Sequence, residues 1–137
     1  MRLAIAGGTG MTGGHIAEIA RGRGHDVSTL SRRTGVELLS GAGLAGSLDG
    51  VDALIDVTKV PTAKPDVSVM FFAGATKSLL MAERAAGVAH HLVLTIVGAE
   101  AAPDGYYAGK LVQERLVAGS DVPWTCLLYT SPSPRDS

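Results

Sequence analysis

Short apolar runs alternate with longer helical stretches along most of the chain. An apolar run bounded by turn residues predicts a strand that is buried on both faces of a sheet. Such runs occupy residues 3–6, 26–30, 36–39, 52–57 and 91–97, and residues 122–125 resemble the opening of a further strand. Because strands that alternate with helices build βαβ units, the pattern predicts the α/β class with a parallel sheet.

The predicted helices are marked by their ends. The first follows the glycines of residues 7–13, with Thr9 or Thr12 as its cap, and runs to about residue 21. A short helix is expected near residues 44–48, and a long one over 67–86 has Asp66 as N-cap and Gly87 after its last residue. The long helix is apolar on nearly all sides, which predicts packing on the sheet or on a partner chain. The last helix is predicted over residues 106–118.

The connection between the strands at 26–30 and 52–57 is short. About 18 residues separate Arg33 from the second of these strands. A full helix and a further strand barely fit into that length, so we predict that this crossover is abbreviated.

Composition narrows the class of protein. The chain has 137 residues, of which 46% are hydrophobic and 18% charged, and its formal net charge is −1. These values suit one domain and exclude a disordered tail or a basic module that binds nucleic acid. No apolar run approaches the roughly 20 residues of a membrane span, and the first run leaves no space for a signal peptide. We therefore expect a cytoplasmic domain without a membrane partner.

Candidate metal ligands are few. The single Cys excludes an internal disulfide framework and a Cys-based zinc site. The four histidines, His15, His25, His90 and His91, show no ligand spacing with acidic residues. We expect no metal, and a structural role for His90 and His91.

Residues 126–137 depart from the Ala/Gly/Val-rich style of the rest of the chain. They resemble the translation of a transposase-type sequencing-library adapter. We expect residues 1–125 to be an incomplete, C-terminally truncated nucleotide-binding domain and residues 126–137 to be a non-native tail. The apolar character of residues 126–129 nevertheless predicts a strand there, with residues 132–137 irregular.

The strongest functional signal follows the first predicted strand. Its residues are Gly7-Gly8-Thr9-Gly10-Met11-Thr12-Gly13, which satisfy G-x-G-x-x-G. Glycine permits the tight turn from strand to helix and lets the backbone approach a pyrophosphate. The helix N-terminus adds free N–H groups and the positive end of a dipole. Because the motif lies between a predicted strand and helix, it predicts a dinucleotide site.

The end of the second strand indicates which dinucleotide. NAD-binding versions of this motif usually place Asp or Glu there to hold the ribose 2′-hydroxyl. This chain has Ser31-Arg32-Arg33 and no acid. An arginine fork fits a 2′-phosphate bidentately, so the sequence favours NADP(H) over NAD(H). A solvated basic turn is the alternative.

A candidate catalytic set lies further along the chain. Tyr106 and Lys110 are four residues apart on a predicted helix, and Thr95 is near the carboxyl end of the strand before it. A tyrosine near an ammonium group loses its proton more easily and can act as the acid for a carbonyl oxygen that receives hydride. The alternatives are an exposed pair of Lys110 with Glu114, helix packing for Tyr106, and Tyr107 as a competing phenol.

Together these residues resemble an atypical short-chain dehydrogenase/reductase of the NmrA-like, NAD(P)H-binding family. The resemblance covers residues 1–125 and includes the glycine loop, the stretch 30–33, the stretch 50–55, the stretch 107–111 with Glu114, and residues 122–125. It implies a doubly wound parallel sheet, the Rossmann fold. The glycine loop would contact pyrophosphate, and Arg32 and Arg33 the 2′-phosphate. It also places Val57, Thr58 and Lys59 along the adenosine, and Thr95, Ile96 and Val97 beside the nicotinamide, with Lys110 on its ribose.

One stretch of this sequence differs from the pattern of that family. The region after Arg33 is shorter than in most relatives, which leaves Glu37 as the obvious candidate for an acid on the adenine side. The first functional hypothesis is an NADPH-dependent reductase of a small carbonyl or quinone-like substrate. The alternatives are a non-catalytic NADP(H)-sensing regulator of the NmrA-like kind, and a relative of nucleotide-sugar epimerases and dehydratases. The oligomeric state stays open.

Overall fold

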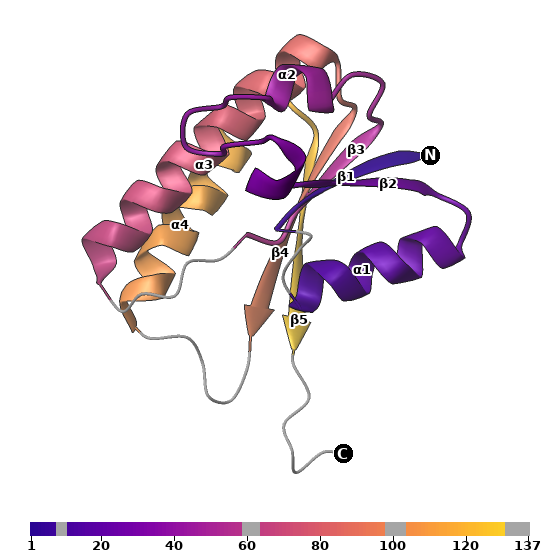
Figure 1. Cartoon of the computed structure of the whole chain (residues 1–137). Coiled ribbons are helices and arrows are strands. Elements are labelled where there is room, and N and C mark those ends of the chain that lie inside the picture. The colour runs from indigo at the N-terminus through magenta and orange to yellow at the C-terminus, as the bar shows by residue number, and fades with distance from the viewer. Residues whose placement is uncertain (8–10, 59–63, 98–103, 131–137) are drawn as a thin grey trace.

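A computed structural model describes residues 1–7, 11–58, 64–97 and 104–130 of the chain. Its centre is a parallel sheet of five strands in the order β2-β1-β3-β4-β5 (Figure 1). The strands are β1 (Arg2–Ala6), β2 (Asp26–Leu30), β3 (Ala53–Asp56), β4 (His90–Val97) and β5 (Trp124–Thr130). This is a doubly wound α/β sheet, and the predicted fold class is confirmed.

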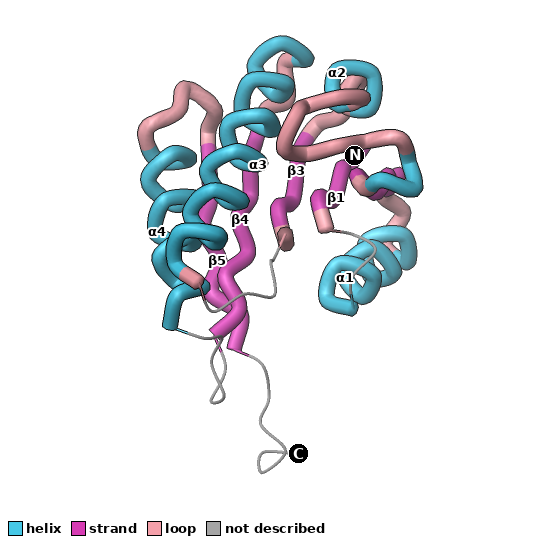
Figure 2. Tube along the Cα trace, turned by 60° about the vertical axis from the view of Figure 1, so that its left-hand side comes forward, coloured by secondary structure: helices cyan, strands magenta, loops and turns pink. Residues whose placement is uncertain are grey.

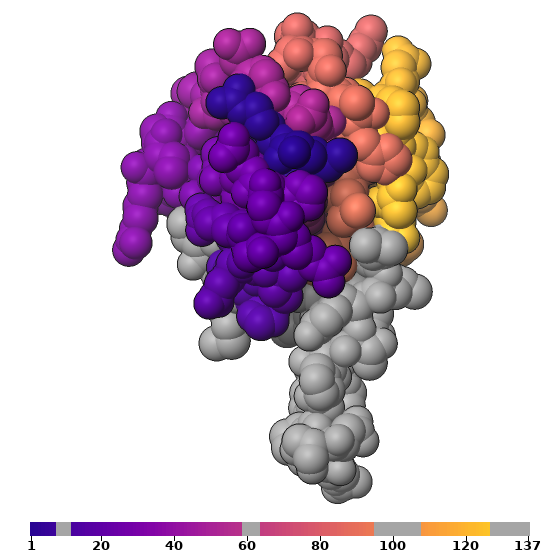
Figure 3. All heavy atoms as spheres, turned by 90° about the vertical axis from the view of Figure 1, so that its right-hand side faces the viewer, coloured from indigo at the N-terminus to yellow at the C-terminus, as the bar shows by residue number. Residues whose placement is uncertain are grey.

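Helices cover both faces of the sheet. They are α1 (Met11–Gly22), α2 (Leu44–Ser47), α3 (Pro65–Ala86) and α4 (Asp104–Ala118). The long helices α3 and α4 lie side by side on one face, whereas α1 lies on the other (Figures 1 and 2). Figure 3 looks onto the side that α1 covers, and the yellow atoms at one edge belong to the residues that lead into β5. None of the helices described is long and apolar enough to cross a membrane.

The crossover from β2 to β3 is abbreviated as predicted, but its predicted strand at residues 36–39 is wrong. Residues 38–41 form a turn, and Glu37 makes only an isolated antiparallel bridge with Ala42. Glycines explain the difference, because Gly35, Gly41 and Gly43 all have positive φ and fold the segment back on itself. The polypeptide therefore passes from a single 3-10 turn, Arg32–Thr34, to the one-turn helix α2. No strand of the described sheet lies beyond β2, which is an edge strand.

Two predicted helix caps are also corrected. Lys64, and not Asp66, is the N-cap of α3, because Pro65 occupies the first turn, where its missing N–H is not needed. Asp66 lies one residue further on, inside the first turn, where its charge favours the helix dipole. Thr12 is the second residue of α1 and not its cap, whereas Thr9 lies outside the described residues. The predicted role of Gly87 is confirmed: it has φ 75° and its N–H donates to the Glu83 carbonyl.

The strand predicted over residues 126–129 is confirmed. These residues belong to β5, which pairs in parallel with β4 and aligns Cys126 with Val93. The origin of residues 126–137 stays a prediction, and residues 131–137 lie outside the described part of the chain.

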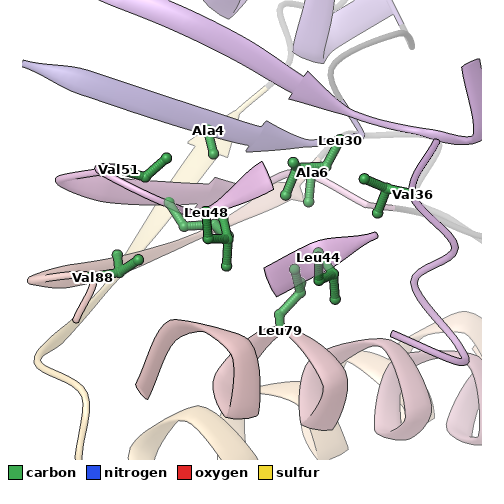
Figure 4. Packing of buried hydrophobic residues seen from close by; sticks show 10 residues of the cluster. Ala4, Ala6, Leu30, Val36, Leu44, Leu48, Val51, Leu79 and Val88 are labelled. Carbon is green, nitrogen blue, oxygen red and sulfur yellow. The ribbon is translucent and has the colours of Figure 1, made fainter. Parts of the chain in front are cut away.

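The main apolar core lies between the sheet and the helices α2 and α3 (Figure 4). Leu44 of α2 and Leu48, which directly follows that helix, meet Leu79 of α3 and the strand residues Ala4 and Leu54, and all five are buried. A smaller cluster on the other face joins the sheet to α1. The short α2 thus packs beside α3 on this face of the sheet.

The two long helices approach each other closely at Gly109. A Cβ atom there would lie 2.1 Å from the Ser68 hydroxyl oxygen and 2.5 Å from the Phe72 ring. Gly109→Ala is therefore expected to force α3 and α4 apart and to destabilise the protein by about 1–3 kcal/mol, the usual effect of overpacking. Gly22→Ala is the control, since a Cβ there would meet nothing within 4 Å. Urea unfolding of both variants checks this, and equal stabilities would contradict it.

A buried acid–base pair joins α3 to β4. Glu83 and His91 are both 0% exposed, and the Glu83 Oε1 atom lies 2.5 Å from His91 Nδ1. The second carboxylate oxygen and His91 Nε2 have no hydrogen-bond partner among the described residues. Burial raises the pKa of Glu83 above its ordinary 4.5, although the hydrogen bond and charge of His91 lower it and the charge of Asp56 raises it further. The predicted structural role of His91 agrees with this position.

The raised pKa of Glu83 predicts a pH dependence of stability. The folded state binds a proton at Glu83 that the unfolded state releases near pH 4.5, so this contribution is present below that pH and is lost as pH rises through the folded pKa. Glu83→Gln cannot titrate. The free energy of unfolding of the wild type relative to Glu83→Gln is therefore expected to fall as the pH rises from 4 toward neutrality. A difference that stays constant or grows over this range would contradict the prediction.

Candidate functional site

A cleft of about 430 Å³ opens at the carboxyl ends of β1, β2 and β3. In open α/β sheets, ligands bind at this end of the strands. Eight of the residues predicted to bind a dinucleotide line it: Gly7, Thr12, Gly13, Ser31, Arg32, Arg33, Val57 and Thr58. The structure thus brings together three predicted segments that are far apart in the sequence.

The glycine loop enters the cleft directly after β1. Gly7 has φ 87°, a conformation that L side chains rarely adopt. A Cβ atom on Gly7 would lie only 2.9 Å from the carbonyl oxygen of Val57, which follows β3. Glycine is required here for two reasons, the backbone conformation and the close approach of two chain segments.

The basic turn forms another wall of the cleft. Thr34 fixes the turn, because its hydroxyl oxygen lies 2.8 Å from the Thr29 carbonyl oxygen and accepts the Ser31 N–H at 3.0 Å. Arg32 and Arg33 are exposed. The Ser31 hydroxyl oxygen is buried and has no hydrogen-bond partner among the described residues. The turn therefore offers two guanidinium groups to an anion.

Some lining residues were not predicted from the sequence. They are Leu30, Val36, Leu38 and Phe71. Apolar side chains from α3 and from the irregular crossover could be assigned to the cleft only once the fold was known. Glu37, the candidate acid on the adenine side, also lines the cleft, and its Oε1 accepts the Leu39 N–H at 3.2 Å.

Other predicted site residues are only partly placed. Gly8, Thr9, Gly10 and Lys59 lie outside the described residues. The backbone of Met11 opens α1, that of Thr95, Ile96 and Val97 closes β4, and that of Tyr106 lies near the start of α4, but their side chains are not described. The catalytic pairing of Tyr106 with Lys110 and the roles of Thr95, Ile96 and Val97 stay predictions.

Lys110 is buried, which contradicts the alternative of an exposed pair with Glu114. It is 4% exposed, and its Nζ donates to Gln113 Oε1 at 2.5 Å and to the Leu94 carbonyl at 3.5 Å. Nζ also lies 5.2 Å from the centre of the Phe72 ring, a cation–π distance. Since Leu94 directly precedes Thr95, the ammonium group lies at the carboxyl half of β4.

The environment of Lys110 changes its acidity. Burial lowers the pKa of Lys110 from its ordinary 10.5, because the charged form loses its hydration. The charges of Asp56, Glu114 and Cys126 act in the opposite direction and raise the pKa of Lys110. Asp56 is the largest of these three influences.

Asp56 and Gln113 were missed by the sequence analysis. Asp56 is 1% exposed at the end of β3, and Gln113 is 0% exposed on α4. Gln113 Nε2 donates to Asp56 Oδ2 at 2.9 Å, and the other carboxylate oxygen accepts the Thr58 N–H at 3.0 Å and the Thr58 hydroxyl at 2.6 Å. The sequence holds one signal for Asp56, which is an acidic residue at the end of an otherwise apolar strand. A buried charge needs a partner, so such a residue indicates a buried polar interaction.

The described side chains form no cluster of metal ligands. Across residues 1–7, 11–58, 64–97 and 104–130, no group of three or more His, Cys, Asp or Glu side chains could hold a metal ion.

No family model and no curated protein matches the chain. Solved structures do match. A protein from Burkholderia pseudomallei is 28% identical, with a TM-score of 0.70 over 93% of this chain and 71% of that protein. UDP-glucose 4-epimerase from Brucella ovis, in complex with NAD, is 18% identical, with a TM-score of 0.78 over 95% of this chain and 52% of the epimerase. The UDP-glucose 4-epimerase of Thermus thermophilus, also with NAD, is 21% identical, with a TM-score of 0.75 over 94% of this chain and 55% of the epimerase.

These likenesses define the class of the chain. It has the Rossmann fold, the fold of the nucleotide-sugar epimerases that it resembles in structure. The chain spans about half the length of these epimerases.

Proposed function

We propose that the chain is the NADP(H)-binding domain of a reductase that transfers hydride to a small carbonyl or quinone-like substrate. The observation that carries this proposal is the single cleft that joins the glycine loop to the basic turn. Backbone N–H groups at the start of α1 suit a pyrophosphate, and the apolar side chains of Val36, Leu38 and Phe71 suit the adenosine.

The preference for NADP(H) rests on the charge of the basic turn. Arg32 and Arg33 are cationic donors, and neither can accept the hydrogen bond of a ribose 2′-hydroxyl. Glu37 lines the cleft as well, but its Oε1 already accepts a backbone N–H, and it is suited to the adenine amino group.

The reductase chemistry rests on residues at the ends of β4 and α4. When bound, the nicotinamide supplies the hydride, and the residues of the chain supply the proton and the orientation. Tyr106 donates the proton to the substrate oxygen, Lys110 favours the tyrosinate that remains, and the Thr95 hydroxyl orients that oxygen. The hydrogen bond of Lys110 to the Leu94 carbonyl supports this arrangement, because it holds the ammonium beside the strand that carries Thr95.

One structural observation favours a second candidate function. The UDP-glucose 4-epimerases of Brucella ovis and Thermus thermophilus share the fold and are complexed with NAD. A relative of nucleotide-sugar epimerases would use the same cleft with the cofactor retained between turnovers. A regulator that senses NADP(H) without turnover would need only the cleft.

Turnover separates these functions. In the full-length protein that contains this chain, NADPH oxidation is expected over a panel of small carbonyl and quinone compounds. Tyr106→Phe is expected to reduce its rate about 10²- to 10⁴-fold, because general acid catalysis is lost. Tyr107→Phe is the matched control and is expected to keep the rate. NADPH binding without oxidation of any compound would instead favour the sensor, and conversion of UDP-glucose without net NADPH oxidation would favour the epimerase.

A further inference from the structure

Four buried polar residues form a continuous hydrogen-bonded chain between the cleft and Lys110. Thr58 lines the cleft and donates to Asp56, Asp56 accepts from Gln113, and Gln113 accepts from Lys110. Thr58 is 6% exposed, and the other three are exposed by 4% or less. This series of hydrogen bonds joins β3 to α4. Because all four residues are buried, water does not compete for these hydrogen bonds.

We propose that Asp56 and Gln113 are positioning residues, and that through Thr58 they couple the position of the Lys110 ammonium to occupancy of the nucleotide cleft. The inference rests on the proposed function, because it takes the cleft to be the nucleotide site. It assigns a task to two residues that neither the glycine motif nor the Tyr106/Lys110 pair includes.

The direction of the hydrogen bonds supports this coupling. An ionised carboxylate can only accept, so Asp56 requires the amide NH₂ group of Gln113 to face it. The carbonyl oxygen of Gln113 must then face the opposite way, toward Lys110, which can only donate. A change at the Asp56 carboxylate therefore reorients the Gln113 amide and moves the acceptor of Lys110.

Because these hydrogen bonds are buried, they respond to a ligand that enters the cleft. A buried polar group that loses its hydrogen-bond partner is destabilised, and a charged group is destabilised more. A nucleotide that contacts Thr58 competes for its hydroxyl, which donates to Asp56 at 2.6 Å. Asp56, Gln113 and Lys110 then have to adjust together, because bulk water cannot replace the lost partner.

A purely structural role is the alternative. In that case Asp56 would only offset the buried Lys110 charge, and removal of Gln113 would lower stability without linking Lys110 to the cleft. The two roles differ in one observable, the response of the Lys110 ammonium group to a ligand that fills only the adenosine end of the cleft.

The test uses nuclear magnetic resonance of the lysine ammonium groups in the whole chain. The sequence contains only four lysines, Lys59, Lys64, Lys77 and Lys110, so the spectrum is simple, and Lys77 on the exposed surface of α3 is the internal reference. The probe is adenosine 2′,5′-bisphosphate, which lacks the nicotinamide. On saturation, the Lys110 signal is expected to shift while the Lys77 signal stays in place.

Gln113→Met removes both amide hydrogen bonds at similar side-chain length. In this variant the Lys110 signal of the free protein is expected to differ from that of the wild type, and its shift on adding the probe is expected to be lost. Thr76→Val is the matched control, because Thr76 is 0% exposed and its hydroxyl oxygen has no hydrogen-bond partner among the described residues. It is expected to keep the wild-type shift. If Gln113→Met does not fold, Asp56→Asn makes the same test.

Each failure has a distinct signature. Binding of the probe with no Lys110 shift, or with an equal shift in Gln113→Met, would overturn the coupling while leaving the nucleotide site intact. Absence of probe binding would overturn the proposed function and the coupling with it. An unchanged Lys110 signal in free Gln113→Met would overturn the positioning role without reference to any nucleotide.

Discussion

Gly7→Ala is expected to destabilise the protein and to abolish nucleotide binding. The new Cβ would have to occupy a conformation with φ 87°, which by itself destabilises a residue other than glycine by about 1–3 kcal/mol. It would also lie 2.9 Å from the Val57 carbonyl oxygen and 3.1 Å from the Thr58 nitrogen. These are backbone atoms, which cannot turn aside as a flexible side chain would. The segments after β1 and β3 must therefore separate, and both of them line the cleft.

Gly24→Ala separates the two causes. Gly24 has φ 88°, almost the same as Gly7, but a Cβ there would meet nothing within 4 Å. It lies after α1 and does not line the cleft. Chemical denaturation and NADPH titration of both variants check the prediction. Equal loss of stability, or normal NADPH binding by Gly7→Ala, would show that the close approach of the two segments is unimportant.

The double substitution Arg32→Ala/Arg33→Ala is expected to weaken NADPH binding and to leave NADH binding nearly unchanged. A hydrogen bond to a charged group contributes about 1.5–3 kcal/mol, so loss of one arginine–phosphate pair corresponds to a roughly 10- to 150-fold loss of affinity. NADH has no 2′-phosphate and makes no such pair. The ratio of NADPH to NADH affinity should therefore fall by at least about tenfold.

A charge-matched control excludes a general electrostatic effect. Arg21→Ala/Arg23→Ala removes the same charge from exposed positions that do not line the cleft. It is expected to leave the affinity ratio in place, apart from a small and salt-dependent loss for both nucleotides. An unchanged ratio in the Arg32/Arg33 variant would mean that these arginines form only a solvated turn.

The sequence predicts the parallel sheet and the position of the cleft well, because both depend on local signals. Apolar runs mark the strands, and the strand–glycine–helix order fixes where β1 ends. The basic turn follows β2 directly, so a parallel sheet necessarily brings it beside the glycine loop. The strand prediction for residues 36–39 is wrong. Their apolar content predicts a strand, but glycines with positive φ on both sides of the segment produce a turn.

The polar chain behind the cleft could not be predicted from the sequence. Gln113 reaches Asp56 across 57 sequence positions, and this pairing exists only because the fold brings a side chain of α4 to the end of β3. Lys110 shows the same limit. Its spacing to Glu114 is typical of an exposed helix pair, yet it is buried because Gly109 allows α4 to pack closely on α3.

The most direct test of the proposed NADP(H) site is calorimetric titration of the full-length protein that contains this chain with NADPH and, separately, with NADH. Our account predicts that both bind in one-to-one stoichiometry and that NADPH binds at least about tenfold more tightly, because one charge-assisted pair is worth more than about 1.4 kcal/mol. Equal or tighter binding of NADH, or no binding of either nucleotide, would contradict it.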